Sequence, residues 1–112
     1  MKKIEAIIRP ESVDAVRNSL GLAGVTGLMI TEIEGHGKQK GIVQQWRGEK
    51  YKVGLLPKAK IEVIVRDKDV EHVCRAIIES ARTGEIGDGK IFIYPVEEAV
   101  RIRTGEKGDA VL

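Results

Sequence analysis

The sequence is short of several residue types, and each shortage excludes a class of protein. Its 112 residues include one cysteine, Cys74, which excludes an internal disulfide framework and suits a reducing compartment. No apolar run is long enough to span a bilayer, and Met1-Lys2-Lys3 leads directly into a strand pattern instead of a signal peptide. We therefore expect a cytoplasmic protein that does not insert into a membrane.

Net charge and aromatic residues are also scarce. A net charge of +2 is too small to indicate a nucleic-acid partner by itself, and only 4% of the residues are aromatic. Hydrophobic residues are plentiful at 42%, which is enough to build the core of one domain of this length. We therefore treat residues 1–112 as a single domain.

An internal repeat organises this domain. Residues 3–16 align with residues 60–73, and Lys, Ile, Glu, Ile, Arg, Val and Val recur at the same places. Each copy reads as a strand that leads into a helix. The apolar residues of the second helix follow the i, i+3, i+4, i+7 spacing of a buried stripe. They are Val70, Val73, Cys74, Ile77, Ile78 and Ala81.

Flanking residues place the boundaries of both helices. Pro10 suits a helix start because its missing N–H would have no partner there, and Asp67 is a candidate N-cap of the second helix. Either Gly21 or Gly24 ends the first helix. The stripe of the first helix that we expect to be buried consists of Val13, Val16 and Leu20.

A further strand pattern follows each helix, at residues 28–34 and 91–94. The order βαββαβ predicts an α+β, ferredoxin-like fold in which both helices cover one face of a four-stranded antiparallel sheet. We expect the opposite face to be largely apolar as well, which indicates an oligomer with clefts between its subunits. The residues predicted on that face are Ile7, Met29, Ile33, Ile64, Phe92 and Tyr94.

A long exposed loop separates the second and third strands. Residues 35–57 show no sustained strand or helix period, are rich in glycine and basic residues, and include Trp46 and Tyr51. Loops longer than about 12–15 residues are uncommon in compact domains and are usually functional or disordered. Glycine next to aromatic residues favours an element that grips a partner over an idle tether.

Three basic segments together point to a polyphosphate ligand. In Thr83-Gly84-Glu85-Ile86-Gly87-Asp88-Gly89-Lys90, glycines let successive amide N–H groups turn toward one anion, and the lysine adds a point charge. This segment differs from a Walker A loop because it precedes a strand and not a helix. Residues 35–41 form a second glycine–lysine segment, and Arg101 and Arg103 lie on one face of an extended strand.

Residues 83–93 resemble the C-terminal signature of the PII nitrogen-signalling proteins, and the whole chain is similar to that family. Residues 35–41, Arg47-Gly48, Tyr51 and residues 56–58 match the family's large loop and its base. The resemblance implies a homotrimer that binds ATP or ADP between subunits and binds 2-oxoglutarate together with ATP and Mg²⁺. It implies a regulatory binding protein and not an enzyme, although slow ATP hydrolysis would be compatible with a sensor.

The resemblance also implies roles for individual residues. Residues 35–57 would be the regulatory loop, residues 82–90 the phosphate-binding loop and residues 101–112 the C-terminal segment. Gln39 would help to hold Mg²⁺, and Lys58 would pair with a carboxylate of 2-oxoglutarate. Met29 and Ile64 would surround the base and sugar of the nucleotide. The residues around its phosphates would be Gly37, Lys38, Gln39, Gly87, Asp88, Gly89 and Lys90, with Arg101 and Arg103 from the neighbouring subunit.

The long loop would contact the protein that is regulated, through Arg47 and Tyr51. The resemblance implies an ammonium transporter, which would bring the protein transiently to a membrane, with glutamine synthetase or another nitrogen enzyme as the alternative. Many bacterial relatives are nucleotidylated at the position of Tyr51. Around it, Trp46, Glu49-Lys50 and Gly54 depart from the family pattern.

Two other classes of protein stay open. An RNA-binding module of the same fold would need aromatic side chains on its central strands, and residues 4–9 and 61–66 have none, so we expect no nucleic-acid partner. A small phosphoryl-transfer enzyme would use His36 as its nucleophile, but the sequence shows no clear base with an orienting partner beside it.

Overall fold

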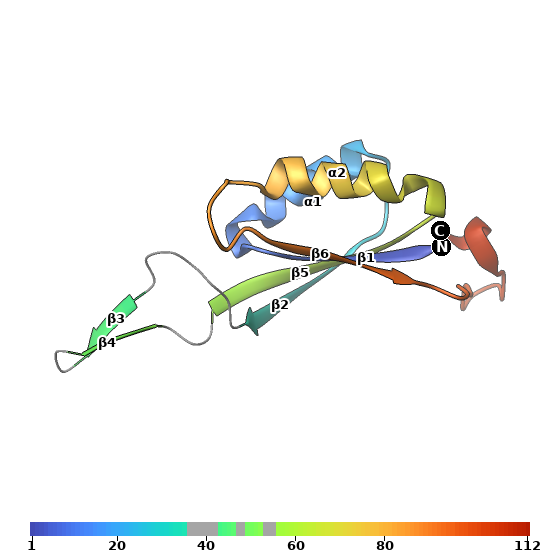
Figure 1. Ribbon diagram of the computed structural model, residues 1–112. Coiled ribbons are helices and arrows are strands. Elements are labelled where there is room, and N and C mark those ends of the chain that lie inside the picture. Colours follow the sequence, from blue (N-terminus) through green and yellow to red (C-terminus); the bar gives the residue numbers. More distant parts are fainter. Residues whose placement is uncertain (36–42, 47–48, 53–55) are drawn as a thin grey trace.

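The computed structural model describes residues 1–35, 43–46, 49–52 and 56–112, and for residues 43–46 and 49–52 it describes the backbone alone. Four strands form one antiparallel sheet in the order β2-β5-β1-β6 (Figure 1). Helices α1 and α2 cover one face of this sheet, which confirms the predicted ferredoxin-like α+β fold (Figure 1). The bounds are β1 (Lys2–Ile8), α1 (Val13–Leu22), β2 (Met29–Gly35), β5 (Leu56–Val65), α2 (Val70–Ala81) and β6 (Gly89–Pro95).

The hydrophobic core lies between the sheet and the two helices. Successive side chains of a strand point to opposite faces, so every second residue of β1 and β5 points toward the helices. Burying one Val, Leu or Ile side chain stabilises a fold by about 1.5–3 kcal/mol relative to leaving it exposed. The buried residues that form this core cluster are Ile4, Ala6, Ile8, Val16, Leu20, Ala59, Ile61, Val63, Val65, Val73, Ile77 and Ala81. Within the described part of the chain, no helix has the length and apolar character needed to cross a membrane.

The predicted helical stripes are buried or half-buried with one exception. Val16 and Leu20 of α1 are buried, as are Val73 and Ile77 of α2. Ile78 is 41% exposed, so its assignment to the stripe was wrong. One residue advances the helix by about 100°, which turns Ile78 away from the sheet when Ile77 points into it.

Short 3₁₀ turns precede both helices, η1 (Pro10–Ser12) before α1 and η2 (Asp67–Asp69) before α2. Pro10 begins the first of them, as predicted. Gly24 has a positive φ of 91° just beyond α1, whereas Gly21 lies inside that helix. Of the two candidate helix ends, the structure therefore selects Gly24.

Asp67 does not cap α2, and that prediction was wrong. Its carboxylate accepts a hydrogen bond from the N-terminal ammonium of Met1 at 2.6 Å and lies 3.4 Å from Lys2 Nζ. The bond to the N-terminal ammonium lowers the pKa of Asp67. A charged partner supplied by the tertiary fold thus replaces the neutral helix N–H groups as the partner of this carboxylate.

The face of the sheet opposite the helices is mixed, where the sequence predicted it to be largely apolar. Glu5 of β1 lies opposite Glu62 of β5. Lys3 Nζ lies 3.5 Å from Glu5 and 3.2 Å from Glu62, and Lys60 Nζ lies 3.7 Å from Glu62. The two lysines offset the repulsion between carboxylates on adjacent strands, and the hydrogen bond to Glu62 raises the pKa of Lys3. Exposed apolar residues remain on the outer strands, namely Met29, Phe92 and Tyr94.

Part of the long loop is regular. β3 (Val43–Trp46) and β4 (Glu49–Lys52) form a separate antiparallel pair, which stands apart from the main sheet in Figure 1. The prediction of no sustained strand in residues 35–57 was wrong here, and also at the start of β5. β3 and β4 are short and mostly polar, so no apolar alternation revealed them.

We predict that Gly89→Ala destabilises the fold much more than Gly84→Ala. Both glycines have positive φ, at 117° and 89°, so alanine is strained at either by about 1–3 kcal/mol. A Cβ at Gly89 would also lie 1.8 Å from Ile7 O, whereas a Cβ at Gly84 would have no neighbour within 4 Å. Urea unfolding at one protein concentration should show an additional loss of roughly 2 kcal/mol for Gly89→Ala. Equal losses would contradict the close approach of β1 and β6.

Candidate functional site

A glycine loop, residues 82–90, leads from α2 into β6 at one end of the sheet and includes the first two residues of that strand (Figure 1). Gly84, Gly87 and Gly89 have φ values of 89°, 102° and 117°, a region that side chains with a Cβ rarely adopt. Gly89 pairs with Ile8 of β1, which carries the end of the loop directly onto an inner strand. The loop is therefore tightly turned and anchored to the sheet.

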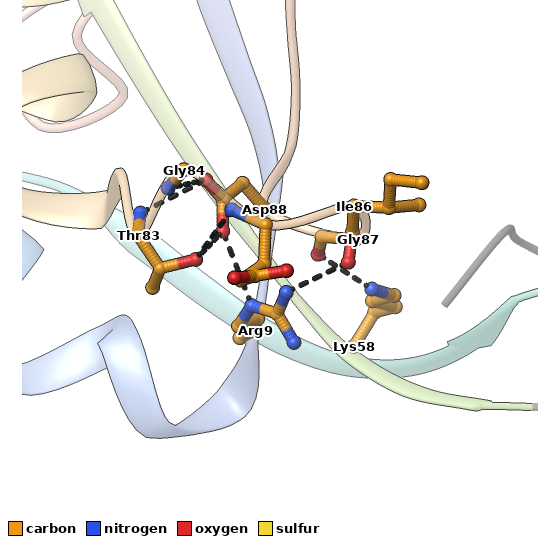
Figure 2. Close-up of polar contacts among 8 residues, drawn as sticks. Arg9, Lys58, Thr83, Gly84, Ile86, Gly87 and Asp88 are labelled. Atoms are coloured by element: carbon orange, nitrogen blue, oxygen red, sulfur yellow. Dashed lines mark hydrogen bonds and ion pairs between the residues drawn. The ribbon is translucent and has the colours of Figure 1, made fainter. Parts of the chain in front are cut away.

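The Asp88 carboxylate organises this loop from within. Oδ2 accepts the N–H groups of Thr83 at 2.8 Å and Gly84 at 2.9 Å, and Oδ1 accepts the Thr83 hydroxyl (Figure 2). These donors, the Thr83 hydroxyl first among them, hold the pKa of Asp88 well below its usual range. The side chain is engaged inside the loop, which leaves the backbone of Asp88 for a contact with a ligand.

A basic side chain that the sequence analysis missed joins this network. Arg9, the residue after β1, donates from Nη2 to Ile86 O at 2.9 Å and from Nε to Asp88 Oδ1 at 3.3 Å (Figure 2). The only signal in the sequence was its place in the internal repeat, where Arg66 is its counterpart. Arg66 is exposed, so the repeat alone would not have distinguished the two.

Lys58 approaches the glycine loop from β5. It is only 9% exposed, and its Nζ donates to Gly87 O at 3.0 Å (Figure 2). No carboxylate among the described residues forms an ion pair with this ammonium. Burying a charge is costly unless an opposite charge compensates it. Among the residues that the structure describes, a carbonyl is the only polar partner of this ammonium, which indicates a place for an anion.

Other predicted site residues lie at the two ends of the sheet. Lys90 pairs with Ile7 near the end of β1 and so lies beside the glycine loop. Ile64 pairs with Lys3 near the start of β1, and together with Met29 it lines a cavity of about 620 Å³. The expected base-and-sugar residues are therefore together, and they are separated along the strands from the expected phosphate residues.

The basic pair near the C-terminus also lies away from the glycine loop. β6 runs from Gly89 at the loop to Pro95 opposite Lys2, and the C-terminal segment that contains Arg101 and Arg103 follows beyond that far end (Figure 1). Arg101 Nη1 donates to the Glu106 carboxylate at 3.0 Å. Within one subunit these arginines do not converge with Lys90, and a site that contains both groups requires a second copy of the chain.

Several predicted residues lie outside the described part of the chain: His36, Gly37, Lys38, Gln39 and Arg47. Tyr51 belongs to β4, where the structure describes the backbone only. The assignments of Mg²⁺ to Gln39 and of a partner protein to Arg47 and Tyr51 therefore stay predictions.

The fold and this site define a class: a ferredoxin-like domain whose glycine loop, with largely buried basic side chains beside it, suits an anionic ligand. The sequence model of the family described as Nitrogen regulatory protein P-II matches residues 1–106. The chain belongs to this family of regulatory proteins, as its resemblance implied.

Individual relatives agree over nearly the full length. The chain is 56% identical over 108 residues to Nitrogen regulatory protein P-II 2 of Methanothermobacter thermautotrophicus, covering 96% of this chain and 94% of the relative. It is 55% identical over 112 residues to Nitrogen regulatory protein P-II of Azospirillum brasilense, covering 99% and 100%. For Nitrogen regulatory protein P-II of Pasteurella multocida, the identity is 53% over 109 residues, covering 97% of each chain. Their names describe regulators, which fits a role other than catalysis.

We predict that Asp88→Asn destabilises the fold at pH 7 and that its effect fades in acid. The pKa of Asp88 in the folded chain is lowered from an ordinary value of 3.8. Its ionised form therefore stabilises the fold fully above that value, and this stabilisation is lost as the pH falls below it toward the lower folded pKa.

Thermal unfolding midpoints between about pH 3 and pH 7 measure this effect, because acid protonates this carboxylate in the unfolded wild type before it does so in the folded one, whereas asparagine does not titrate. The matched control is Asp14→Asn, which removes an exposed carboxylate paired with Arg17 on α1. A pH-independent difference for Asp88→Asn would contradict the role of its charge.

Proposed function

We propose that this P-II family member signals nitrogen status by binding ATP or ADP between the subunits of a homotrimer. We further propose that it binds 2-oxoglutarate with Mg²⁺ and regulates an ammonium transporter or a nitrogen-assimilation enzyme such as glutamine synthetase. The buried ammonium of Lys58 beside the glycine loop carries the ligand part of this proposal. Family membership supports the regulatory part.

The glycine loop supplies groups suited to phosphate. Positive φ at Gly87 and Gly89 lets backbone N–H groups turn toward one anion, and Lys90 adds a positive charge beside them. Because Asp88 is already saturated by donors inside the loop, its charge is compensated near the proposed phosphates. The same arrangement would accept either ATP or ADP, which differ by one phosphate.

The separation of the site residues supports a cleft between subunits. One subunit would present Lys90 and the glycine loop, and its neighbour would present Arg101 and Arg103. The uncovered sheet face supports the oligomer, since it combines neutralised charge with the exposed apolar residues Phe92 and Tyr94. A homotrimer also fits the family.

A second ligand would bind through Lys58. A carboxylate of 2-oxoglutarate would supply the anion that this buried ammonium lacks among the described residues. Mg²⁺ takes oxygen ligands, so ATP phosphates, the keto acid and the amide oxygen of Gln39 would be able to share one ion. Binding would then be cooperative, because the second ligand completes the metal shell begun by the first.

The long loop would transmit ligand state to the partner. Lys58 follows residues 35–57 in the chain, and Gly35 lies next to it, with an ideal Cβ position 3.9 Å from Lys58 Cγ. A ligand at Lys58 therefore lies at the base of this loop. It shifts the loop only by its differential affinity for two loop states, with ADP favouring the extended state and ATP with 2-oxoglutarate releasing the partner. Binding to a transporter would place the cytoplasmic protein transiently at a membrane, and slow ATP hydrolysis would be incidental to signalling.

The nucleotide site can be tested by substitution and by mixing chains. Lys90→Ala should weaken ATP binding by about 2 kcal/mol in calorimetric titration, since it removes a charged hydrogen-bond donor. Lys68→Ala, in the exposed turn η2, should leave ATP binding unchanged. Mixed trimers of Lys90→Ala and Arg103→Ala chains should regain some intact clefts. A monomeric mass in light scattering, or no recovery in mixed trimers, would argue against a shared site.

The partner proposal predicts ligand-dependent association with a membrane. The protein should co-purify with an ammonium transporter in the presence of ADP and be released by ATP with 2-oxoglutarate, because the two conditions favour different loop states. Arg47→Ala should reduce the retained fraction, whereas Arg17→Ala on α1 should not. Retention that ignores both the ligands and Arg47 would overturn this part of the proposal.

A further inference from the structure

Arg9 contacts the glycine loop at two points at once. Its side chain is only 12% exposed, and its guanidinium donates to the Asp88 carboxylate at 3.3 Å and to Ile86 O at 2.9 Å (Figure 2). A guanidinium is planar and holds its donors in a rigid fork. One side chain from the end of β1 therefore sets the separation and orientation of two positions in the loop.

These two positions lie where the loop needs support. Gly87 follows Ile86 directly and has the most conformational freedom among residue types, so its place depends on its neighbours. The Asp88 carboxylate also binds the amides of Thr83 and Gly84, so Arg9 is connected through it to the start of the loop. The other end is held where Gly89 approaches Ile7 O.

The charge of Arg9 is already compensated by Asp88. A neutralised pair exerts little net attraction on a phosphate nearby, so Arg9 is poorly suited to act as a direct charge for the ligand. Lys58 differs, because among the described residues its only hydrogen-bond partner is the carbonyl of Gly87, so it is the group available to an anion. Of the two basic side chains that hold the loop, Arg9 is the one that serves the loop alone.

We propose that Arg9 is a positioning residue of the nucleotide site: through Ile86 and Asp88 it fixes the backbone N–H groups of the glycine loop in the geometry that receives phosphate. The inference rests on the proposed nucleotide function and adds a residue that acts without touching the ligand. In this proposal the geometry of the guanidinium, and not its charge, determines the effect of Arg9 on nucleotide binding.

Three variants test this role: Arg9→Met removes charge and fork, Arg9→Lys keeps the charge without the fork, and Arg17→Met is a matched control that removes a surface pair with Asp14. ATP affinity is measured by calorimetry. Amide hydrogen exchange at Thr83 and Gly84 is measured without nucleotide. We expect Arg9→Met to weaken ATP at least tenfold and to speed exchange at both amides. Arg9→Lys should recover less than a third of the lost affinity, and Arg17→Met should match the wild type.

The two readouts separate the possible failures. ATP affinity within twofold of the wild type in Arg9→Met would overturn the inference. Full recovery in Arg9→Lys with exchange unchanged would also overturn it, because charge or direct contact would then explain the effect. If Arg9→Met does not fold, Arg9→Lys with the same two measurements decides the question. If the wild type itself binds no ATP, the proposed nucleotide function fails, while the exchange rates still report whether Arg9 holds the loop.

Discussion

β1 is hydrogen-bonded along both edges, to β5 on one side and to β6 on the other, and the rest of the molecule is built around this strand. Its inward side chains Ile4, Ala6 and Ile8 are buried beneath the helices. Its end receives the glycine loop, where Gly89 has no room for a Cβ, and Arg9 follows immediately. Core packing, strand register and support of the candidate site therefore depend on the same backbone.

Two charged groups at the glycine loop, the Asp88 carboxylate within it and the Lys58 ammonium beside it, have opposite surroundings. Asp88 is surrounded by donors and serves the loop's own structure. Lys58 is buried with a carbonyl as its partner and without an ion-pair partner among the described residues. The first arrangement holds the loop by its own hydrogen bonds, which would reduce the entropy lost on binding of the proposed ligand. The second leaves a place suited to an anion at the base of the long loop.

Patterns that repeat along the chain could be predicted from the sequence, and contacts between distant segments could not. Helix spacing located the buried residues Val73 and Ile77, and the glycine–lysine pattern located the loop that now surrounds Asp88. Asp67 was misassigned because its carboxylate binds the N-terminal ammonium of Met1, which is distant in the sequence, and not the nearby helix N–H groups that the capping rule considers. Arg9 was missed because its neighbours in the sequence do not indicate that residues 86 and 88 lie beside it in the folded chain.

By itself, then, the sequence determined the order of the two helices and the four strands of the main sheet, most residues of the core and the family, because apolar periodicity and a continuous motif are local properties. Only the tertiary structure decided that the inner part of the open sheet face is charged, since that follows from the register that places Glu5 opposite Glu62. It also decided that Lys58 is buried against Gly87 and that Arg9 holds Asp88. Burial and ion pairing depend on which strands become neighbours in the sheet. The spacing of residues along the chain does not predict which strands pair.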